Sequence, residues 1–166
     1  DQTICEGDSP QALTSFAPSG DGTFTYQWQD SPDGVVFTDI AGATSETYAP
    51  GALTADTWYK RIVTSSLNGT DCTEETNAVR VTVNNFDPGS ISADQTICEG
   101  DTPAAFTSVA ATGDFTSVAY QWYESTDDVT YNIIAGATAE TYAAGALTQD
   151  TWYKREATAT LNGVDC

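Results

Sequence analysis

Histidine and methionine are both absent from this 166-residue chain. Without histidine, the chain alone cannot form Ser–His–Asp or Cys–His catalytic groups or histidine-ligated metal sites, unless a partner supplies the base. No phosphate-binding glycine motif follows a predicted strand and opens a helix. Paired carboxylates are plentiful, but we expect no deep cleft in which they could hydrolyse a glycoside. We therefore expect a protein that is not an enzyme.

Basic residues are scarce. Five Lys and Arg residues stand against 24 Asp and Glu residues, which gives a net charge of −19. A field of this sign repels nucleic acid phosphates and anionic lipid headgroups, so we expect neither as a partner. No stretch approaches 18 consecutive apolar residues, so we expect no membrane insertion.

The chain instead contains a long internal repeat. The motif DQTICEGD at Asp1 returns at Asp94, and residues 1–72 recur as 94–166 with one insertion and about two thirds identity. The period is too long for a solenoid unit of about 20 to 50 residues and suits one small all-β domain. Duplication in series favours a stalk or an adhesive array over a catalyst.

Short runs of Thr, Val, Tyr and Trp, separated by Gly, Pro, Asp and Ser, predict strands and turns rather than helices. Alternation of Val79, Val81 and Val83 with polar residues indicates a strand with one buried face. Seven short strands at this spacing fit an immunoglobulin-like β-sandwich. The predicted strands are Gln2–Cys5, Ala12–Ala17, Phe24–Gln29, Val35–Ile40, Glu46–Tyr48, Trp58–Ser65 and Asn77–Val83.

We predict an all-β chain of two tandem immunoglobulin-like (fibronectin III-like) sandwiches. Residues 1–85 form the first, 86–93 a short linker, and 94–166 a second that lacks its last strand. A sandwich without its last strand exposes an unpaired edge. Two readings follow: the chain is a segment of a longer polymer, or a neighbouring molecule donates the strand. The absence of Met at position 1 and the stop in mid-repeat favour the first.

Four cysteines without a CxxC pair indicate structural disulfides and an extracellular setting. Of three possible connectivities, two respect the repeat: pairs within each copy, or a chain in which Cys72 joins Cys98. In an immunoglobulin-like topology, the first strand starts at the pole where the sixth ends, so Cys5 and Cys72 can meet. About ten strand residues at roughly 3.3 Å each separate Cys72 from Cys98, too far for a bond that needs Cα atoms within about 7 Å. We predict Cys5–Cys72 and Cys98–Cys166.

The repeated aromatic residues predict a core. Trp28 and Trp122, in the repeated YQW, are at the middle of a strand, where this architecture places a core tryptophan. The motif around Tyr59 and Tyr153 resembles the tyrosine corner of immunoglobulin and fibronectin type III domains. That resemblance implies inward-facing rings whose hydroxyls bond upstream backbone. Arg61 and Arg155 share the inward parity and need a carboxylate or carbonyl partner that the sequence does not name.

Trp58 and Trp152 fall on the opposite strand face. An exposed tryptophan can stack on a sugar ring, but it more often covers a loop or an interface.

Carboxylates at turns are candidate calcium ligands. None fits a twelve-residue calcium loop, so solvated turn carboxylates are the simpler interpretation. We expect no cofactor and keep Ca²⁺ as the alternative. The candidates are Asp30, Asp33, Asp87, Asp94, Asp127 and Asp128, with Glu124 beside them.

Taken together, TICEGD, YQW, IAGAT, ETYA, GALT and TWYKR, with the last strand at Thr76–Val83, resemble the immunoglobulin-like repeats of large Bacteroidota surface adhesins. Such repeats occur in tandem in proteins exported by type IX secretion, including gliding-motility and filament proteins. The resemblance implies a non-catalytic spacer at the cell surface, whose partners are neighbouring copies in a longer chain or fibre and a surface glycan or protein ligand. The alternative is a carbohydrate-binding module that uses Trp58 and Trp152.

Overall fold

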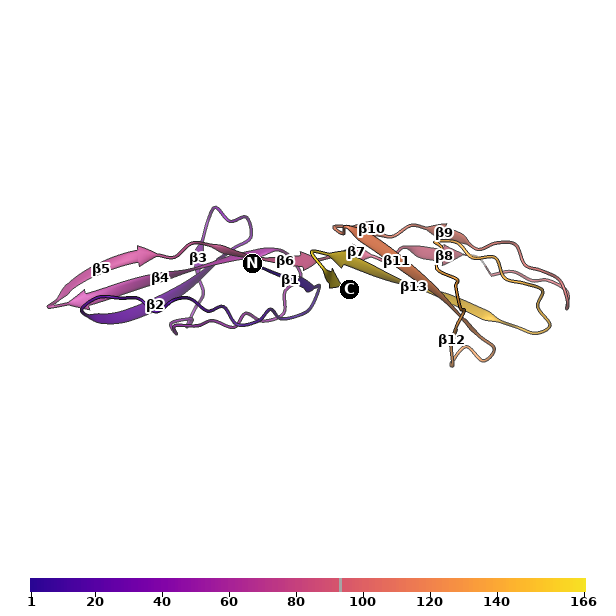
Figure 1. Ribbon diagram of the computed structural model, residues 1–166, viewed down its shortest axis with the longest axis horizontal. Helices are drawn as coiled ribbons and strands as arrows, with labels where there is room; N and C mark the ends of the chain where they lie inside the picture. The colour runs from indigo at the N-terminus through magenta and orange to yellow at the C-terminus, as the bar shows by residue number, and fades with distance from the viewer. Residues whose placement is uncertain (93) are drawn as a thin grey trace. The chain divides into compact units, whose positions relative to one another are not determined.

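The computed structural model describes residues 1–92 and 94–166. These residues form two compact units, Asp1–Asn85 and Phe86–Cys166. The described residues contain strands and turns and no helix, hence no helix that could cross a membrane (Figure 1). Each unit is an immunoglobulin-like β-sandwich, so the chain is all-β with two sandwiches in tandem, as predicted.

One six-stranded sheet forms the larger layer of the first unit. Its strand order is β1–β6–β4–β2–β3, and β5 also pairs with β4. β1 runs parallel to β6, while the other pairs are antiparallel. The strands are β1 (Gln2–Cys5), β2 (Thr23–Ser31), β3 (Thr38–Asp39), β4 (Thr57–Leu67), β5 (Thr70–Glu75) and β6 (Val79–Asn84).

The long strand β4 has partners along both of its edges. β2 covers one edge, while β5 and β6 share the other: Ile62 faces Glu75 in β5, and Tyr59 faces Val79 in β6. The register changes by one residue between these pairs, which defines a β-bulge around Thr76. The Arg61 amide donates to the Thr76 hydroxyl at 3.0 Å, and the Thr76 amide donates to the Arg61 carbonyl at 2.9 Å.

The second layer is irregular. Leu13 and Tyr48 form an isolated antiparallel bridge with hydrogen bonds of 2.7 and 3.2 Å. Between the layers, Leu13, Trp28, Tyr59 and Val81 form the buried core. Strand alternation puts Trp28, Tyr59 and Val81 on one face of the sheet, and Leu13 packs on them from the second layer.

The second unit has the same central pair of long antiparallel strands, but different strands flank that pair. β11 pairs with β12 and β13, and β13 pairs with β14. Trp122 and Ala159 are fully buried. Its described residues contain no counterpart of β6, the strand that the sequence analysis expects to be missing. The strands are β11 (Ser117–Ser125), β12 (Asn132–Ile133), β13 (Trp152–Leu161) and β14 (Val164–Asp165).

The prediction that residues 86–93 form a linker is wrong for residues 86–92, which the structure describes. β7 (Phe86–Asp87) pairs with β10 (Thr112–Gly113), and β8 (Ser90–Ser92) pairs with β9 (Thr107–Val109). Residue 93 lies outside the described residues. The segment is short and polar, but a sandwich edge supplies hydrogen-bond partners that make it a strand. It therefore belongs to the second unit.

Three predicted strands are shorter than expected. Within Val35–Ile40 only Thr38–Asp39 is a strand, because the amides of Val35 and Val36 donate to the Asp33 carboxylate instead of to a neighbouring strand. Ala12–Ala17 and Glu46–Tyr48 reduce to the Leu13–Tyr48 bridge. The counterpart of residues 14–16 in the second unit is β9, whose partner β8 comes from the preceding segment.

Candidate functional site

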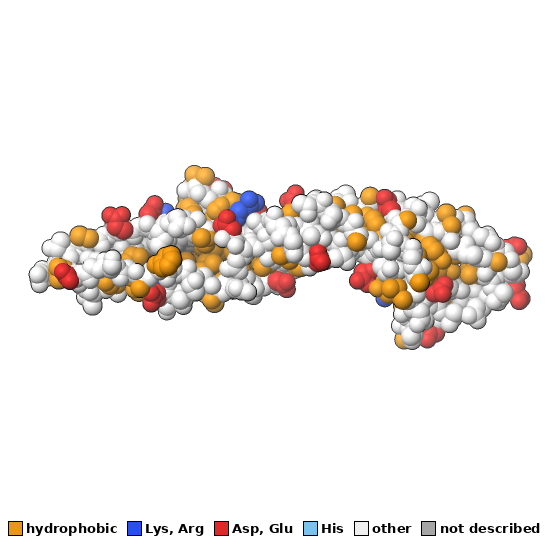
Figure 2. Space-filling view, in the orientation of Figure 1, with side chains coloured by type: hydrophobic (Ala, Val, Ile, Leu, Met, Phe, Trp, Pro, Cys, Tyr) orange, Lys and Arg blue, Asp and Glu red, His pale blue; other side chains and the backbone are white. Residues whose placement is uncertain are grey.

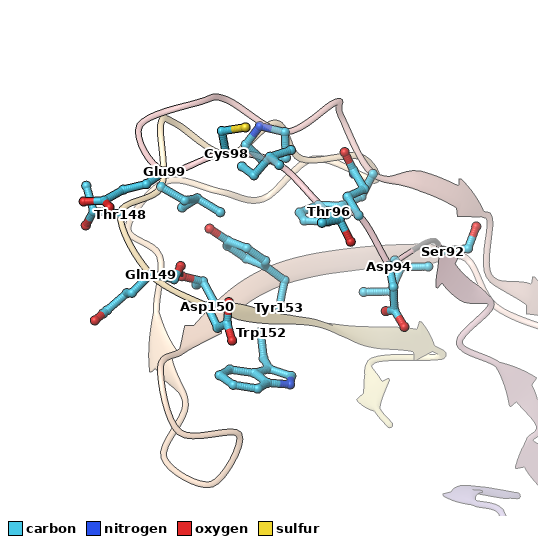
Figure 3. Close-up of a pocket in the computed structure, with 17 residues that line it drawn as sticks. Ser92, Asp94, Thr96, Cys98, Glu99, Thr148, Gln149, Asp150, Trp152 and Tyr153 are labelled. Carbon is cyan, nitrogen blue, oxygen red and sulfur yellow. Dashed lines mark hydrogen bonds between the residues drawn. The ribbon is translucent and has the colours of Figure 1, made fainter.

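The second unit contains a groove with a volume of about 680 Å³ (Figure 3). One wall is the segment 94–99, and the other is the loop 147–151 with the start of β13. Tyr153 points into the groove, while Trp152 points to the other side of the strand. Ile97, Phe106 and Leu147 add apolar surface to the walls. The groove is therefore lined by both apolar and polar side chains.

The Tyr153 ring forms part of an aromatic cluster at the base of the groove. Its centroid lies 4.9 Å from Phe106 and 5.9 Å from Tyr142. Burial, with the nearby carboxylate of Glu124, raises the pKa of Tyr153 above its ordinary value. The ring is neutral at physiological pH and acts as an apolar wall.

The cysteines do not pair as predicted. Cys5 and Cys166 are disulfide-bonded, whereas Cys72 and Cys98 are exposed free thiols. In the first unit, Cys5 lies beside Asn84, beyond the start of β4, and Cys72 lies beside Ser65 near its end. The stretch of β4 from Thr57 to Ser65 alone spans roughly 26 Å, against the 7 Å or so that a disulfide allows.

The error comes from strand polarity. Cys5 is at the end of β1, and β1 runs parallel to β6, which is antiparallel to β4. The end of β1 is therefore at the pole where β4 starts. Cys72, after the hairpin that follows β4, is at the other pole. Cys98 likewise lines the groove beside the start of β13, while the Cys166 amide donates to the Ala159 carbonyl near its end.

Trp28 and Trp122 are core residues, with exposed fractions of 3% and 0%. Their indole N–H groups donate to the carbonyls of Ser45 and Ala139 at 3.0 and 2.9 Å. Each indole therefore ties its strand to the opposite layer, and neither ring is available to a ligand.

Trp58 does not offer a free stacking face. The Arg80 guanidinium lies 4.9 Å from the centre of the indole. At Gly34, which has a φ of +72°, a Cβ atom would lie 3.1 Å from the ring, so the turn packs directly on it. In the second unit, Asp128 replaces Gly34, and Trp152 is 39% exposed. Only Trp152 retains the exposure that a sugar platform requires.

Arg61 and Arg155 face inward, and both bond to carbonyl groups. Arg61 is 1% exposed and donates to the carbonyl of Glu46 at 2.5 Å. Arg155 donates to the carbonyls of Glu140 at 2.9 Å and Pro88 at 2.9 Å. Their guanidinium groups lie 4.6 Å from the Tyr26 ring and 4.4 Å from the Tyr120 ring. Each arginine therefore links the sheet to segments of the opposite layer.

The tyrosine corner is only partly realised. Tyr59 is buried, but its hydroxyl bonds the side chain of Thr57 rather than upstream backbone. Burial, together with the nearby Tyr48 and Asp30, raises the pKa of Tyr59 to about 12. Among the described residues, the Tyr59 hydroxyl has no hydrogen bond to upstream backbone, which the resemblance to a tyrosine corner implied.

The turn carboxylates act as local caps. The Asp127 carboxylate accepts from the amides of Thr130 and Val129 at 2.7 and 2.9 Å, and these bonds, with one from Ser125, lower its pKa to about 2. In the first unit, Asp33 accepts from Val35 and Val36 in the same way, which lowers its pKa.

The other calcium candidates have separate local roles. Asp30 accepts from the Thr38 hydroxyl, Asp128 from the Tyr131 hydroxyl, and Asp87 from the Gly89 amide. Asp94 lines the groove. In residues 1–92 and 94–166, no three His, Cys, Asp or Glu side chains are grouped so that they could hold a metal ion. Calcium binding stays a prediction.

Sequence comparison places both copies in one family. The chain matches the family described as "Domain of unknown function (DUF8696)" over residues 1–85 and again over residues 87–165. The chain therefore belongs to this family and contains two of its domains. No curated protein matches the chain in sequence.

Among solved structures, the chain is similar to the amphioxus IgVJ-C2 molecule. The similarity covers 96% of this chain and 99% of that chain, with 12% identity and a TM-score of 0.36. Such a distant likeness carries no argument about binding or activity. The fold assignment depends on the strand order and core described above.

We predict that Arg61→Ala lowers the free energy of unfolding by roughly 2–4 kcal/mol, because it removes a buried side chain, its hydrogen bond to the Glu46 carbonyl and its packing on Tyr26. Urea denaturation measures this. The neighbouring Lys60 is on the other face of β4 and pairs with Glu75, whose side chain is 60% exposed, so Lys60→Ala is the control and is expected to cost less than about 1 kcal/mol. Equal losses for the two variants would contradict the structural role of Arg61.

We also predict that stability falls as the pH rises from 10 to 12. The pKa of Tyr59 is about 12 in the folded chain, compared with about 10 in an unfolded one. The folded state therefore resists ionisation, so this stability is present below pH 10 and lost as the pH approaches 12. Urea denaturation between pH 8 and 12 is expected to show a flatter decline for Tyr59→Phe. An unchanged slope would show that the Tyr59 hydroxyl ionises freely.

Proposed function

We propose that the chain is a non-catalytic spacer of an extracellular adhesin or surface filament, of the kind that Bacteroidota export by type IX secretion. The observation that carries the proposal is the direct succession of two domains of one family, matched over residues 1–85 and 87–165. The segment after the first domain is built into the second through β7 and β8. Tandem domains without a separate linker suit a structure whose length matters.

The charge and the cysteines support an extracellular setting. Acidic side chains are spread over both units, and only five basic residues accompany them (Figure 2). Like charge keeps successive domains soluble and opposes their collapse onto one another. The disulfide-bonded Cys5 and Cys166 are consistent with an oxidising compartment. In this proposal, the partners are neighbouring copies of the repeat, and any ligand-binding tip is elsewhere.

The spacer role predicts an effect of copy number. The chain is placed in one, two or four copies between a cell-surface anchor and a peptide epitope on a bacterium with a thick surface layer. Antibody access to the epitope is expected to increase with copy number, and more steeply than with Gly/Ser segments of equal length, which collapse as random coils. Access that is independent of copy number, or equal to that of the Gly/Ser segments, would contradict the proposal.

The alternative function is carbohydrate binding. Trp152 supports it, because this indole is 39% exposed, whereas Trp58 is covered by Arg80 and Gly34. On a glycan array, the spacer proposal predicts no specific binding by the chain. Specific binding that is lost in Trp152→Ala and kept in Trp58→Ala would replace the spacer with a glycan-binding module.

A further inference from the structure

We propose that the disulfides of this protein join successive domains, from the first cysteine of one domain to the second cysteine of the next. Cys5 and Cys166 are the bonded cysteines and belong to different domains, while Cys72 and Cys98 are free thiols. In an array, Cys72 takes the same bond from a preceding domain, and Cys98 takes it from a following domain. The inference rests on the tandem repeats of the proposed function and names the partner of each free thiol.

Each unit contains two cysteines, yet neither unit closes its own pair. The first unit contains Cys5 and Cys72, and the second contains Cys98 and Cys166. In each unit one cysteine is bonded and the other is a free thiol. Because the chain has four cysteines, the two bonded ones can only bond each other. The free thiols therefore do not result from a missing partner within their own domain.

The free Cys98 has the local structure of the bonded Cys5. Both are in the sequence TICEGD. The Asp8 amide donates to the Cys5 carbonyl at 3.1 Å, and in the second unit the Asp101 amide donates to the Cys98 carbonyl at 3.0 Å. The glycine of this turn has a φ of +85° in the first unit and +86° in the second. The turn after the free cysteine is therefore the same as the turn after the bonded one.

The free Cys72 has the local structure of the bonded Cys166. Cys72 lies opposite Ser65 across the hairpin, and the Cys166 amide donates to the carbonyl of Ala159, the counterpart of Ser65, at 2.9 Å. The Asn-Gly turn of this hairpin has φ values of +51° and +80° in both units. Each position that is free in one unit is thus bonded in the other.

The first cysteine of a domain lies where the chain leaves that domain. Cys5 is paired with Asn84, the last residue of β6, and the first unit ends at Asn85. The cysteine of β1 is therefore at the end of the sandwich from which the polypeptide continues into the next domain.

The second cysteine of a domain lies where the chain enters it. The second unit begins with β7, which pairs with β10, the strand before β11. At the start of β11, Ser117 faces Thr160, and Thr160 also faces Asp165, the neighbour of Cys166. The two cysteines that bond are therefore those at the two domain ends that the polypeptide connects. One cysteine at each end allows every domain one bond to the preceding domain and one to the following domain.

Each further bond is an oxidation. Two thiols lose two protons and two electrons as one S–S bond forms, and a disulfide-containing oxidant accepts the electrons and is reduced to two thiols. Cys72 and Cys98 are exposed, so both an oxidant and a neighbouring cysteine have access to their sulfur atoms.

Bonds between domains limit how far the array lengthens under tension. When the chain is held at residues 1 and 166, the shortest covalent path runs from Asp1 to Cys5 and then across the sulfur bridge. Unfolding of both domains then gives a contour length of about 20 Å, compared with about 580 Å for the reduced chain. A spacer with such bonds keeps its length even when a domain unfolds.

A chain with a third domain tests the proposal. Residues 73–166 are appended after Cys166, so that a following domain supplies two more cysteines, and the protein is oxidised with glutathione disulfide. We expect two free thiols, as in the two-domain chain, and a new bond between Cys98 and the second cysteine of the third domain. Peptide mapping of the unreduced protein identifies the bonds. Four free thiols, with Cys98 among them, or none, with each domain closing its own pair, would overturn the proposal.

Two matched variants locate the new bond. In the three-domain chain, Cys98→Ser is expected to raise the number of free thiols from two to three, because it releases its partner in the third domain. Cys72→Ser is the control and is expected to lower the number to one while both bonds remain. The same thiol count for the two variants would contradict the pairing.

Force measurements on the two-domain chain give an independent readout. With handles at residues 1 and 166, we expect a contour length of about 20 Å without reductant and about 580 Å with dithiothreitol. A value of about 110 Å without reductant would show that each domain closes its own pair, and would overturn the proposal. These results do not depend on whether epitope access increases with copy number, so this proposal and the spacer function fail separately.

Discussion

The structure depends on one constraint: a long central strand must find hydrogen-bond partners along both of its edges. In the first unit, β4 meets this constraint with β2 on one side and with β5 and β6 on the other. The bulge at Thr76 lets one continuous stretch of chain cover the whole second edge. In the second unit, β14 covers only the end of β13, and the start of that strand borders the groove.

The same constraint explains at which end of a sandwich each cysteine lies. Since β5 and β6 both run antiparallel to β4, the chain leaves the first unit at the pole where β4 begins. Cys5 is at that pole, and Cys72 is at the other. The free thiols of Cys72 and Cys98 are exposed at opposite ends of their respective units. The arrangement of cysteines is thus a result of strand direction and not of distance along the sequence.

Besides the buried indoles, an inward-facing arginine in each unit links the sheet to the opposite layer. Arg61 and Arg155 bring a positive charge into the interior of a strongly acidic chain, and backbone carbonyls accept their hydrogen bonds. Charged donors form stronger hydrogen bonds than neutral ones, so one side chain can fix several loop segments. In the second unit, the Pro88 carbonyl joins this network, which ties the segment between β7 and β8 to the core.

Much of the fold could be predicted from the sequence, because the repeat and the alternation of apolar residues are local signals. They identified the two sandwiches and the core positions of Trp28 and Trp122. The cysteine pairing could not be derived in this way, because it required the relative direction of β1, β4 and β6. The linker prediction failed because residues 86–92 become strands only through partners in the second unit. The packing of Arg80 and Gly34 on the Trp58 indole could not be predicted either, because these residues are far from Trp58 in the sequence and meet it only in the folded chain.

Amide hydrogen exchange of the full chain tests the central claim most directly, because residues 94–98 and 150–153 repeat the sequences of residues 1–5 and 56–59. The account predicts slow exchange for residues 2–5 and 57–59, where β6 is paired, and fast exchange for residues 95–98 and 151–153. Equal protection of the two sets would show that the edges of the second unit are already paired, and would contradict the account.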